Sequence, residues 1–325
     1  MPEKIAERVE RAIRERVFPG CVIGLIRTNK RIVLPFGTLD YGQELVKENT
    51  IYDVASVTKS IPVASLALTF IEEGKLSLAD KVTKYVPELQ NDYGATIEDL
   101  LRYRVHGARL SGLQLRTFEQ VRSDIFENGF SAAPGESYYT NLPAYLLGVV
   151  IERVAGEILP ALAHKYFFEP LKMSDTTFFP HDIVRVAPTE IVDGKEIRGI
   201  VHDESARVFS RARRAVGHAG LFSTAPDLLN FLAALLRDQG PSLVHVREGA
   251  EQGLGWQVNE PRWMGKFAEK KTFGKTGFTG TCVVCDVERG VAFVVLSNRT
   301  YPRRPADGSA IDEFRRDIAD IILVK

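Results

Sequence analysis

The chain has 325 residues, of which 45% are hydrophobic and 26% charged, a composition typical of a globular protein with a sizeable core. Lysine plus arginine and aspartate plus glutamate number 42 each, so no net charge attracts nucleic acid or an anionic membrane. No segment approaches the roughly 18 apolar residues of a membrane-spanning helix. We therefore expect a small-molecule or peptide partner, and neither nucleic acid nor a membrane.

Residues 1–17 predict a surface helix. Ile5, Val9, Ile13 and Val17 recur every four positions and form one apolar stripe, while charged residues occupy the other faces. The segment lacks the apolar stretch and small-residue cleavage site of a secretory signal. We therefore expect a cytoplasmic location.

Strand patterns occur near both ends of the chain and helical patterns occur between them. Apolar runs at Cys21–Ile26 and Arg31–Phe36, split by Thr28-Asn29-Lys30, predict a β-hairpin. Helices are expected at Val57–Glu73, Ile97–Tyr103, Phe118–Asn128, Pro143–Ala155, Leu159–Phe168 and Pro226–Arg237. Further strands are expected at Gly255–Val258, Lys271–Gly274, Thr281–Val287 and Val291–Ser297, before a closing helix at Ala310–Leu323.

This order predicts an α+β fold in which an antiparallel sheet is flanked by the terminal helices. We expect a single domain over 1–325, with a sheet lobe formed by 1–55 and 250–325 and an all-helical lobe, 56–249, inserted into it. A cleft is expected where the lobes meet.

The cysteines Cys21, Cys282 and Cys285 are too few for a disulfide framework. Cys282 and Cys285 have the spacing of a redox or zinc pair, but in a strand an offset of three residues points them to opposite faces. We interpret them as buried structural thiols. The histidines are scattered without metal-ligand spacing, His202-Asp203 is interpreted as structural, and we expect neither a metal nor a cofactor.

Asp53-Val-Ala-Ser56-Val-Thr-Lys59 is the first segment with reactive potential. Ser56 and Lys59 are three apart at a predicted helix start, so they lie about one turn from each other on one face. A serine hydroxyl needs an adjacent base, and lysine serves when burial or nearby positive charge lowers its pKa. Serine and lysine are common, and this spacing alone also fits chance.

Tyr139-Thr-Asn141 is the second segment, just before the helix expected at Pro143. A phenol between two ammonium groups is favoured as its anion and can transfer a proton. Asn141 can donate and accept hydrogen bonds with a substrate amide. An aromatic ring packed under a helix cap is the structural alternative.

Lys275-Thr276-Gly277 is the third segment, followed by Phe278 and a predicted strand. A strand edge beside a cleft can pair with an extended substrate, Lys275 supplies positive charge, and Gly277 permits close approach. A glycine-rich turn with a solvated lysine is the structural alternative.

Taken together and in this order, the three segments resemble the serine β-lactamase and penicillin-binding-protein family, most closely its class C β-lactamase, D-alanyl-D-alanine peptidase and esterase members. Phe18-Pro-Gly20, Gly217-His-Ala-Gly-Leu-Phe-Ser-Thr224 and Leu296-Ser-Asn298 are also similar to stretches of these enzymes, so the resemblance covers nearly the whole chain. It implies a β-lactamase/transpeptidase-like fold.

The resemblance implies that Ser56 is acylated by an ester, peptide or β-lactam. Lys59 and Tyr139 would then transfer its proton, and Lys275 would polarise the phenol. Backbone N–H groups of Ser56 and Phe278 would stabilise the oxyanion. Substrate contacts would come from Asn141, Thr276, Gly277 and Phe278.

Two features bear on the substrate. Lys275 stands where many esterase-like relatives have histidine, which favours carboxylate-bearing substrates, and Arg303 resembles a residue of the region that contacts a substrate carboxylate. Segment 102–112 replaces the His-Thr-Ser-Gly stretch of many relatives, so we expect an altered pocket wall.

Other functions remain open at this point. The scaffold could bind penicillin or peptidoglycan fragments, or form assemblies, with little turnover. The arginines Arg207, Arg211, Arg213 and Arg214 lack interleaved aromatic residues and predict a solvated loop rather than a nucleic-acid surface. No G-x-S-x-G elbow of an α/β-hydrolase is found.

Overall fold

A six-stranded antiparallel sheet forms the centre of the protein in the computed structural model, which describes residues 1–28, 30–110, 117–237 and 243–324. The strand order is β2-β1-β10-β9-β8-β7. The strands are β1 (Gly20–Arg27), β2 (Lys30–Gly37), β7 (Gln257–Val258), β8 (Thr272–Thr276), β9 (Cys282–Asp286) and β10 (Val291–Ser297). Strands from both ends of the chain pair directly, with Cys21 opposite Ser297 and Arg27 opposite Val291.

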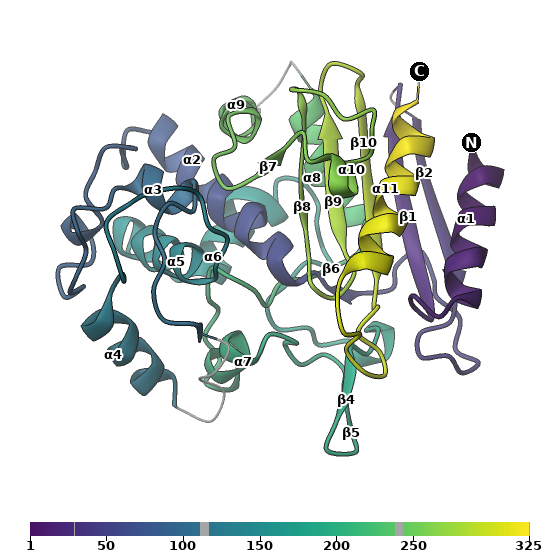
Figure 1. The fold of residues 1–325 in the computed structure, drawn as a ribbon, viewed down its shortest axis with the longest axis horizontal. Helices are drawn as coiled ribbons and strands as arrows, with labels where there is room; N and C mark the ends of the chain where they lie inside the picture. Colours follow the sequence, from purple (N-terminus) through teal and green to yellow (C-terminus); the bar gives the residue numbers. More distant parts are fainter. Residues whose placement is uncertain (29, 111–116, 238–242, 325) are drawn as a thin grey trace.

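The terminal helices cover one face of this sheet. α1 (Pro2–Arg14) and α11 (Ser309–Leu323) lie side by side there, as Figure 1 shows in purple and yellow. Ile5 and Val9 of α1 are buried with Phe314 and Ile318 of α11 in one apolar cluster. The stripe predicted for residues 1–17 thus faces the sheet, because burying apolar side chains stabilises the helix against it.

Helix α8 (Ala225–Leu236) covers the opposite face of the sheet, and the helical lobe adjoins this side (Figure 1). That lobe also contains α2 (Ser65–Glu72), α3 (Ile97–Leu101), α4 (Phe118–Asn128), α5 (Leu142–Ala155), α6 (Leu159–Ala163) and α7 (Glu204–Arg211). α9 (Val244–Glu251) and α10 (Pro261–Met264) precede and follow β7. The predicted α+β fold is confirmed.

The two thiols of β9 lie on opposite faces of the sheet, as predicted. Cys282 belongs to the cluster under the terminal helices and Cys285 to the cluster shared with the helical lobe. Burial raises the pKa of Cys282 to about 11 and raises the pKa of Cys285 as well. High-pKa buried thiols are poor nucleophiles and ligands, which agrees with a structural role.

Short elements escaped the sequence prediction. Three helices, α7, α9 and α10, were not expected, nor were the pairs β3 (Tyr52–Asp53) with β6 (Phe222–Ser223) and β4 (Glu190–Val192) with β5 (Lys195–Ile197). Asn29 of the predicted hairpin turn lies outside the described residues. Within the described parts of the chain, no helix has both the length and the apolar character needed to cross a bilayer.

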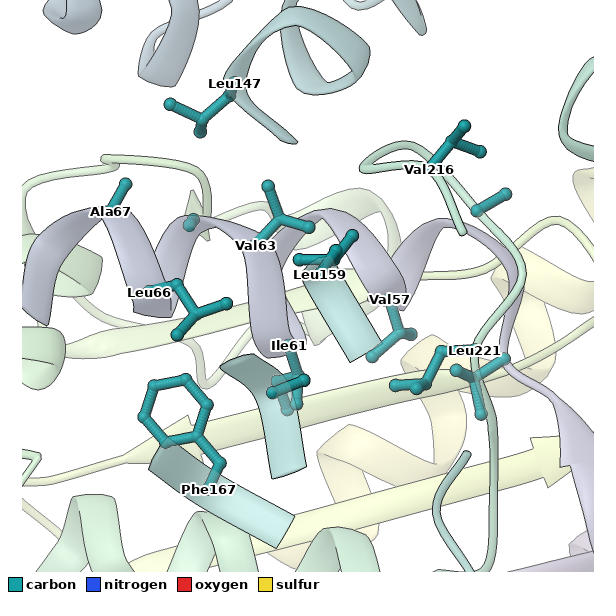
Figure 2. Packing of buried hydrophobic residues seen from close by; sticks show 14 of the residues in the cluster. Val57, Ile61, Val63, Leu66, Ala67, Leu147, Leu159, Phe167, Val216 and Leu221 are labelled. Carbon is teal, nitrogen blue, oxygen red and sulfur yellow. The ribbon is translucent and has the colours of Figure 1, made fainter. Parts of the chain in front are cut away.

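The segment expected as one helix, Val57–Glu73, is divided. A 3₁₀ helix η1 (Ala55–Lys59) and a π-helical turn η2 (Ser60–Ala64) precede α2, and Ile61 has the extended angles φ −116° and ψ 108°. The break follows from Pro62, because a residue before proline avoids the helical region. Figure 2 shows Val57, Ile61, Val63 and Leu66 of this segment packed among Leu147, Phe167 and Leu221, so the apolar core fixes its position.

Candidate active site

Ser56 and Lys59 meet as their spacing predicted. Lys59 Nζ donates to Ser56 Oγ over 2.8 Å and to the carbonyl oxygen of His218 over 2.6 Å. Lys59 is 1% exposed, whereas Ser56 is half-buried at the surface of a hollow. The amine is therefore held against the hydroxyl while the hydroxyl stays accessible.

The residue before Ser56 has an uncommon backbone conformation. Ala55 has φ +47°, in the left-handed region that non-glycine residues rarely adopt. Its N–H donates to Asp53 Oδ1 over 2.8 Å, and the other oxygen, Oδ2, accepts the N–H of His202 over 2.8 Å. Burial raises the pKa of Asp53 to about 6. This buried carboxylate stabilises the turn that presents Ser56.

Tyr139 lies next to this pair. Its ring centroid is 5.4 Å from Lys59 Nζ and 4.6 Å from Lys275 Nζ. The Tyr139 side chain is half exposed, but its hydroxyl end is desolvated, which opposes ionisation. The two ammonium groups and the polar neighbours Ser56 and Lys59 outweigh this effect, so the pKa of Tyr139 lies below its usual value. The phenolate form of Tyr139, which can accept a proton, is thus easier to reach than in a free tyrosine.

Lys275 is buried between two phenols. It is 1% exposed, its Nζ lies 4.7 Å from the ring centroid of Tyr103, and it donates to the Tyr103 hydroxyl over 3.3 Å. Burial lowers the pKa of Lys275 to about 8. Sequence reasoning missed Tyr103, although it lies in segment 102–112, which was expected to alter the pocket wall; residues 111 and 112 of that segment lie outside the described residues.

The loop after β8 is tied to the segment before Ser56. Thr279 Oγ1 donates to the Asp53 carbonyl over 2.7 Å, and Thr281 Oγ1 donates to the Val54 carbonyl over 3.1 Å. A Cβ on Gly277 would lie only 2.3 Å from the Val54 carbonyl oxygen, so only glycine fits here. Close approach brings Thr276, Gly277 and Phe278 to the wall that Ser56 also lines.

Ser56, Tyr139, Thr276, Gly277 and Phe278 line one hollow of about 480 Å³, whereas Tyr103 and Lys275 line a separate hollow that shares Tyr139 with it. The wall of the Ser56 hollow includes Asn141 and, unexpectedly, His202 and Asp203, which the sequence analysis had interpreted as structural. The His202 ring stacks on Phe278 with a centroid distance of 5.7 Å. Burial and the nearby Arg304 and Arg207 lower the pKa of His202 to about 3, so it is neutral at pH 7.

A polar chain orients Asn141. Its Nδ2 donates to Asp203 Oδ2 over 3.2 Å, while Asp203 Oδ1 accepts from Ser205 Oγ over 2.6 Å and lies 3.4 Å from His218 Nε2. Burial opposes ionisation of Asp203, but His218 and Ser205 lower its pKa far below the usual range. Since a carboxylate only accepts hydrogen bonds, Asp203 fixes which end of the Asn141 amide points toward it.

Comparison with known proteins places this geometry in a family. The model of the family described as Beta-lactamase matches residues 5–315. The chain belongs to the beta-lactamase family. It is a serine hydrolase of this β-lactamase-related type, in agreement with the resemblance found in the sequence.

Curated relatives in the family include a putative D-alanyl-D-alanine carboxypeptidase of Escherichia coli strain K12, 29% identical over 308 residues that cover 78% of this chain and 70% of the relative. One of the same description in Salmonella agona is 28% identical over 313 residues, covering 79% and 71%.

Two solved structures share the fold. EstCE1, a hydrolase with promiscuous acyltransferase activity, has a TM-score of 0.78 at 20% identity and covers 99% of this chain and 98% of its own. The D-alanine carboxypeptidase AmpC from Burkholderia cenocepacia has a TM-score of 0.75 at 21% identity, with 97% of each chain covered.

The arginine expected to meet a substrate carboxylate does not reach the hollow. Arg303 is exposed and lines a separate depression with Tyr41 and Tyr301. Arg299 and Arg304 line the Ser56 hollow instead. Arg207 of the predicted solvated run is also buried, with its guanidinium donating to the carbonyls of Val201 and His202.

Among the described residues, no group of three or more His, Cys, Asp or Glu side chains has the arrangement of a metal site.

Proposed function

We propose that this protein hydrolyses an ester or amide through an acyl-enzyme formed on Ser56. The observation that carries the proposal is the 2.8 Å contact between Lys59 Nζ and Ser56 Oγ at the wall of an open hollow. A nucleophile within hydrogen-bond reach of a base, with a second group orienting that base, is the arrangement that covalent catalysis requires.

Proton transfer would proceed from Ser56 Oγ to the Lys59–Tyr139 pair as Oγ attacks the substrate carbonyl. Lys59 and Lys275 lower the pKa of Tyr139 from its usual value, which supports a phenolate as acceptor. The same phenol, once protonated, would donate to the leaving group, and it would later take a proton from the water that hydrolyses the acyl-enzyme. The bond to the leaving group breaks first and the Ser56 ester breaks second.

Backbone N–H groups of Ser56 and Phe278 would stabilise the oxyanion. Three contacts support this role: the Phe278 carbonyl accepts from Arg299 Nε over 2.8 Å, and the hydroxyls of Thr279 and Thr281 tie the loop to the segment before Ser56. A preorganised donor of this kind contributes about 3 kcal/mol to the transition state.

A carboxylate near the scissile bond is the substrate feature that the charges favour. Arg262, Arg304 and Arg315 of the hollow each contact a protein carboxylate. Arg299, which is 8% exposed, bonds instead to the carbonyl oxygens of Phe278 and Asp307 and makes no ion pair with a described carboxylate. Its charge is therefore available to an anionic substrate, as in a peptide that ends in a free carboxylate.

Turnover should be compared across p-nitrophenyl esters, a chromogenic cephalosporin and peptides ending in D-alanine. Each peptide is tested beside its C-terminal amide, which lacks the negative charge. We expect a higher kcat/KM for the free carboxylate. Equal values would contradict the substrate class, and binding without any turnover would favour a penicillin- or peptidoglycan-fragment-binding role.

A further inference from the structure

A second hollow, of about 320 Å³, lies in the helical lobe. It is enclosed by the start of α4, one face of α5, the start of α6 and segment 209–217. Among the described residues it shares no lining residue with the Ser56 hollow. We call it the arginine hollow and define it by Phe118, Tyr145, Glu152, Phe209, Arg213 and Arg214.

Its floor is aromatic. The Phe209 ring centroid lies 5.5 Å from that of Tyr145 and 6.2 Å from that of Phe118. Tyr145 is only 3% exposed, yet its hydroxyl makes no hydrogen bond to another described residue. Because Tyr145 lines the hollow and its hydroxyl has no partner among the described residues, this group is available to a ligand there.

Its rim carries unpaired positive charge. Arg213 and Arg214 are exposed, stack over Phe179 and Phe118 at 4.6 and 4.7 Å, and make no ion pair with a described carboxylate. The opposing group is Glu152, whose Oε1 accepts the Leu159 N–H over 2.7 Å. Burial raises the pKa of Glu152, and Arg214 opposes that rise.

These features define a ligand class. The aromatic floor suits an apolar body, the guanidinium forks suit a carboxylate, and the Tyr145 hydroxyl adds a donor. Arg122 and Arg153 also line the hollow and share Glu88, so the guanidinium groups outnumber the carboxylates there and an anion is favoured. Glu152 in the same wall repels a phosphate dianion about twice as strongly as a monocarboxylate.

One wall of the arginine hollow is joined to the catalytic amine. Gly217 lines it, and the next residue, His218, gives its carbonyl to Lys59 Nζ over 2.6 Å. A Cβ on Gly217 would lie 2.1 Å from the Ala144 carbonyl oxygen, so this segment lies directly against α5. The Tyr145 ring also lies 6.2 Å from the His218 ring. A ligand bound in the arginine hollow therefore contacts the segment whose carbonyl accepts the hydrogen bond from Lys59.

We propose that the arginine hollow is a second ligand site, which binds a small monocarboxylate with an apolar body and thereby changes the rate at which Ser56 is acylated. Binding to the hollow is independent of the proposed function. Only the effect on acylation rests on it.

Calorimetry on the full chain tests the binding, with 4-phenylbutanoate as probe and 4-phenylbutan-1-ol and phenyl phosphate as comparisons. We expect saturable binding of the carboxylate, weaker binding of the other two, and an affinity about tenfold lower in Arg214→Gln because one charged hydrogen bond is lost. Arg211→Gln is the matched control, since Arg211 is exposed nearby but does not line the hollow. We expect it to bind as the natural chain does.

The acylation rate with a fluorescent penicillin is then measured with and without saturating 4-phenylbutanoate. We expect the probe to change the rate in the natural chain and in Arg211→Gln but not in Arg214→Gln. Absent binding, or binding that Arg214→Gln leaves unchanged, would overturn the site, and a rate effect that persists in Arg214→Gln would show that the probe acts at Ser56. Bound probe without a rate effect would overturn the coupling. If penicillin does not acylate the chain, the rate is measured with an activated ester. If neither reagent acylates Ser56, the proposed function fails while calorimetry still decides the site.

Discussion

Replacing Lys275 by methionine should stabilise the protein while impairing turnover. Burial lowers the pKa of Lys275 from 10.5 to about 8, and at about 1.4 kcal/mol for each pH unit this corresponds to about 3 kcal/mol of unfavourable charge burial. The contacts of Nζ with the Tyr103 and Tyr139 rings, at 4.7 and 4.6 Å, offset about 1–2 kcal/mol. We therefore expect Lys275→Met to raise the free energy of unfolding at pH 7 by about 1–2 kcal/mol.

The difference in stability between Lys275→Met and the natural chain should change with pH in a defined direction. Folded Lys275 loses its proton near pH 8, whereas unfolded lysine keeps it to about pH 10.5. Between these values the unfolded chain binds more protons, so the natural protein gains stability as pH rises. The advantage of Lys275→Met should be constant below pH 8 and shrink above it.

Urea denaturation at a series of pH values measures the difference, with Lys195→Met as control because Lys195 is exposed on β5. The control should show no comparable gain and no such pH trend. A destabilised Lys275→Met, or a difference from the natural chain that does not vary with pH, would show that burial of the Lys275 charge does not destabilise the fold.

Three further substitutions test the site by steady-state kinetics and circular dichroism. Lys59→Ala should lose most of kcat with the fold intact, and near-normal rates would remove Lys59 as the proton carrier. Tyr139→Phe should slow turnover and accumulate acyl-enzyme visible by mass spectrometry, and unchanged kinetics would make Tyr139 structural. Gly277→Ala should displace the loop from Val54, because its Cβ would lie 2.3 Å from the Val54 carbonyl oxygen. Its kcat should fall more than its stability, and a fully active variant would contradict the proposed oxyanion site at Ser56.

Regular elements were the part of the fold that the sequence predicted well. The hairpin of β1 and β2, helix α4 and strands β9 and β10 have strong apolar periodicity and were found within a few residues of their expected ends. Helix α10 has only four residues and β3 only two. Such short elements are fixed by tertiary contacts, so no local period identifies them.

Within the site, sequence spacing predicted the meeting of Ser56 with Lys59, but it could not predict partners brought from distant segments. Tyr103 reaches Lys275 across 172 positions and Asp203 reaches Asn141 across 62. No pattern in the sequence around these residues indicates either contact. Arg303 was predicted as the anion-binding arginine from the resemblance alone. The direction of a side chain in an irregular loop cannot be derived from sequence periodicity.

Every catalytic step proposed for this protein requires that the Ser56 hydroxyl becomes covalently acylated. The natural chain and Ser56→Ala should be incubated with a fluorescent penicillin and with an activated ester, and the peptides should then be mapped by mass spectrometry. We predict an adduct with at least one reagent, on the peptide that contains Ser56, and none on that peptide in Ser56→Ala. An adduct located elsewhere, or no adduct with either reagent, would be incompatible with Ser56 as the nucleophile.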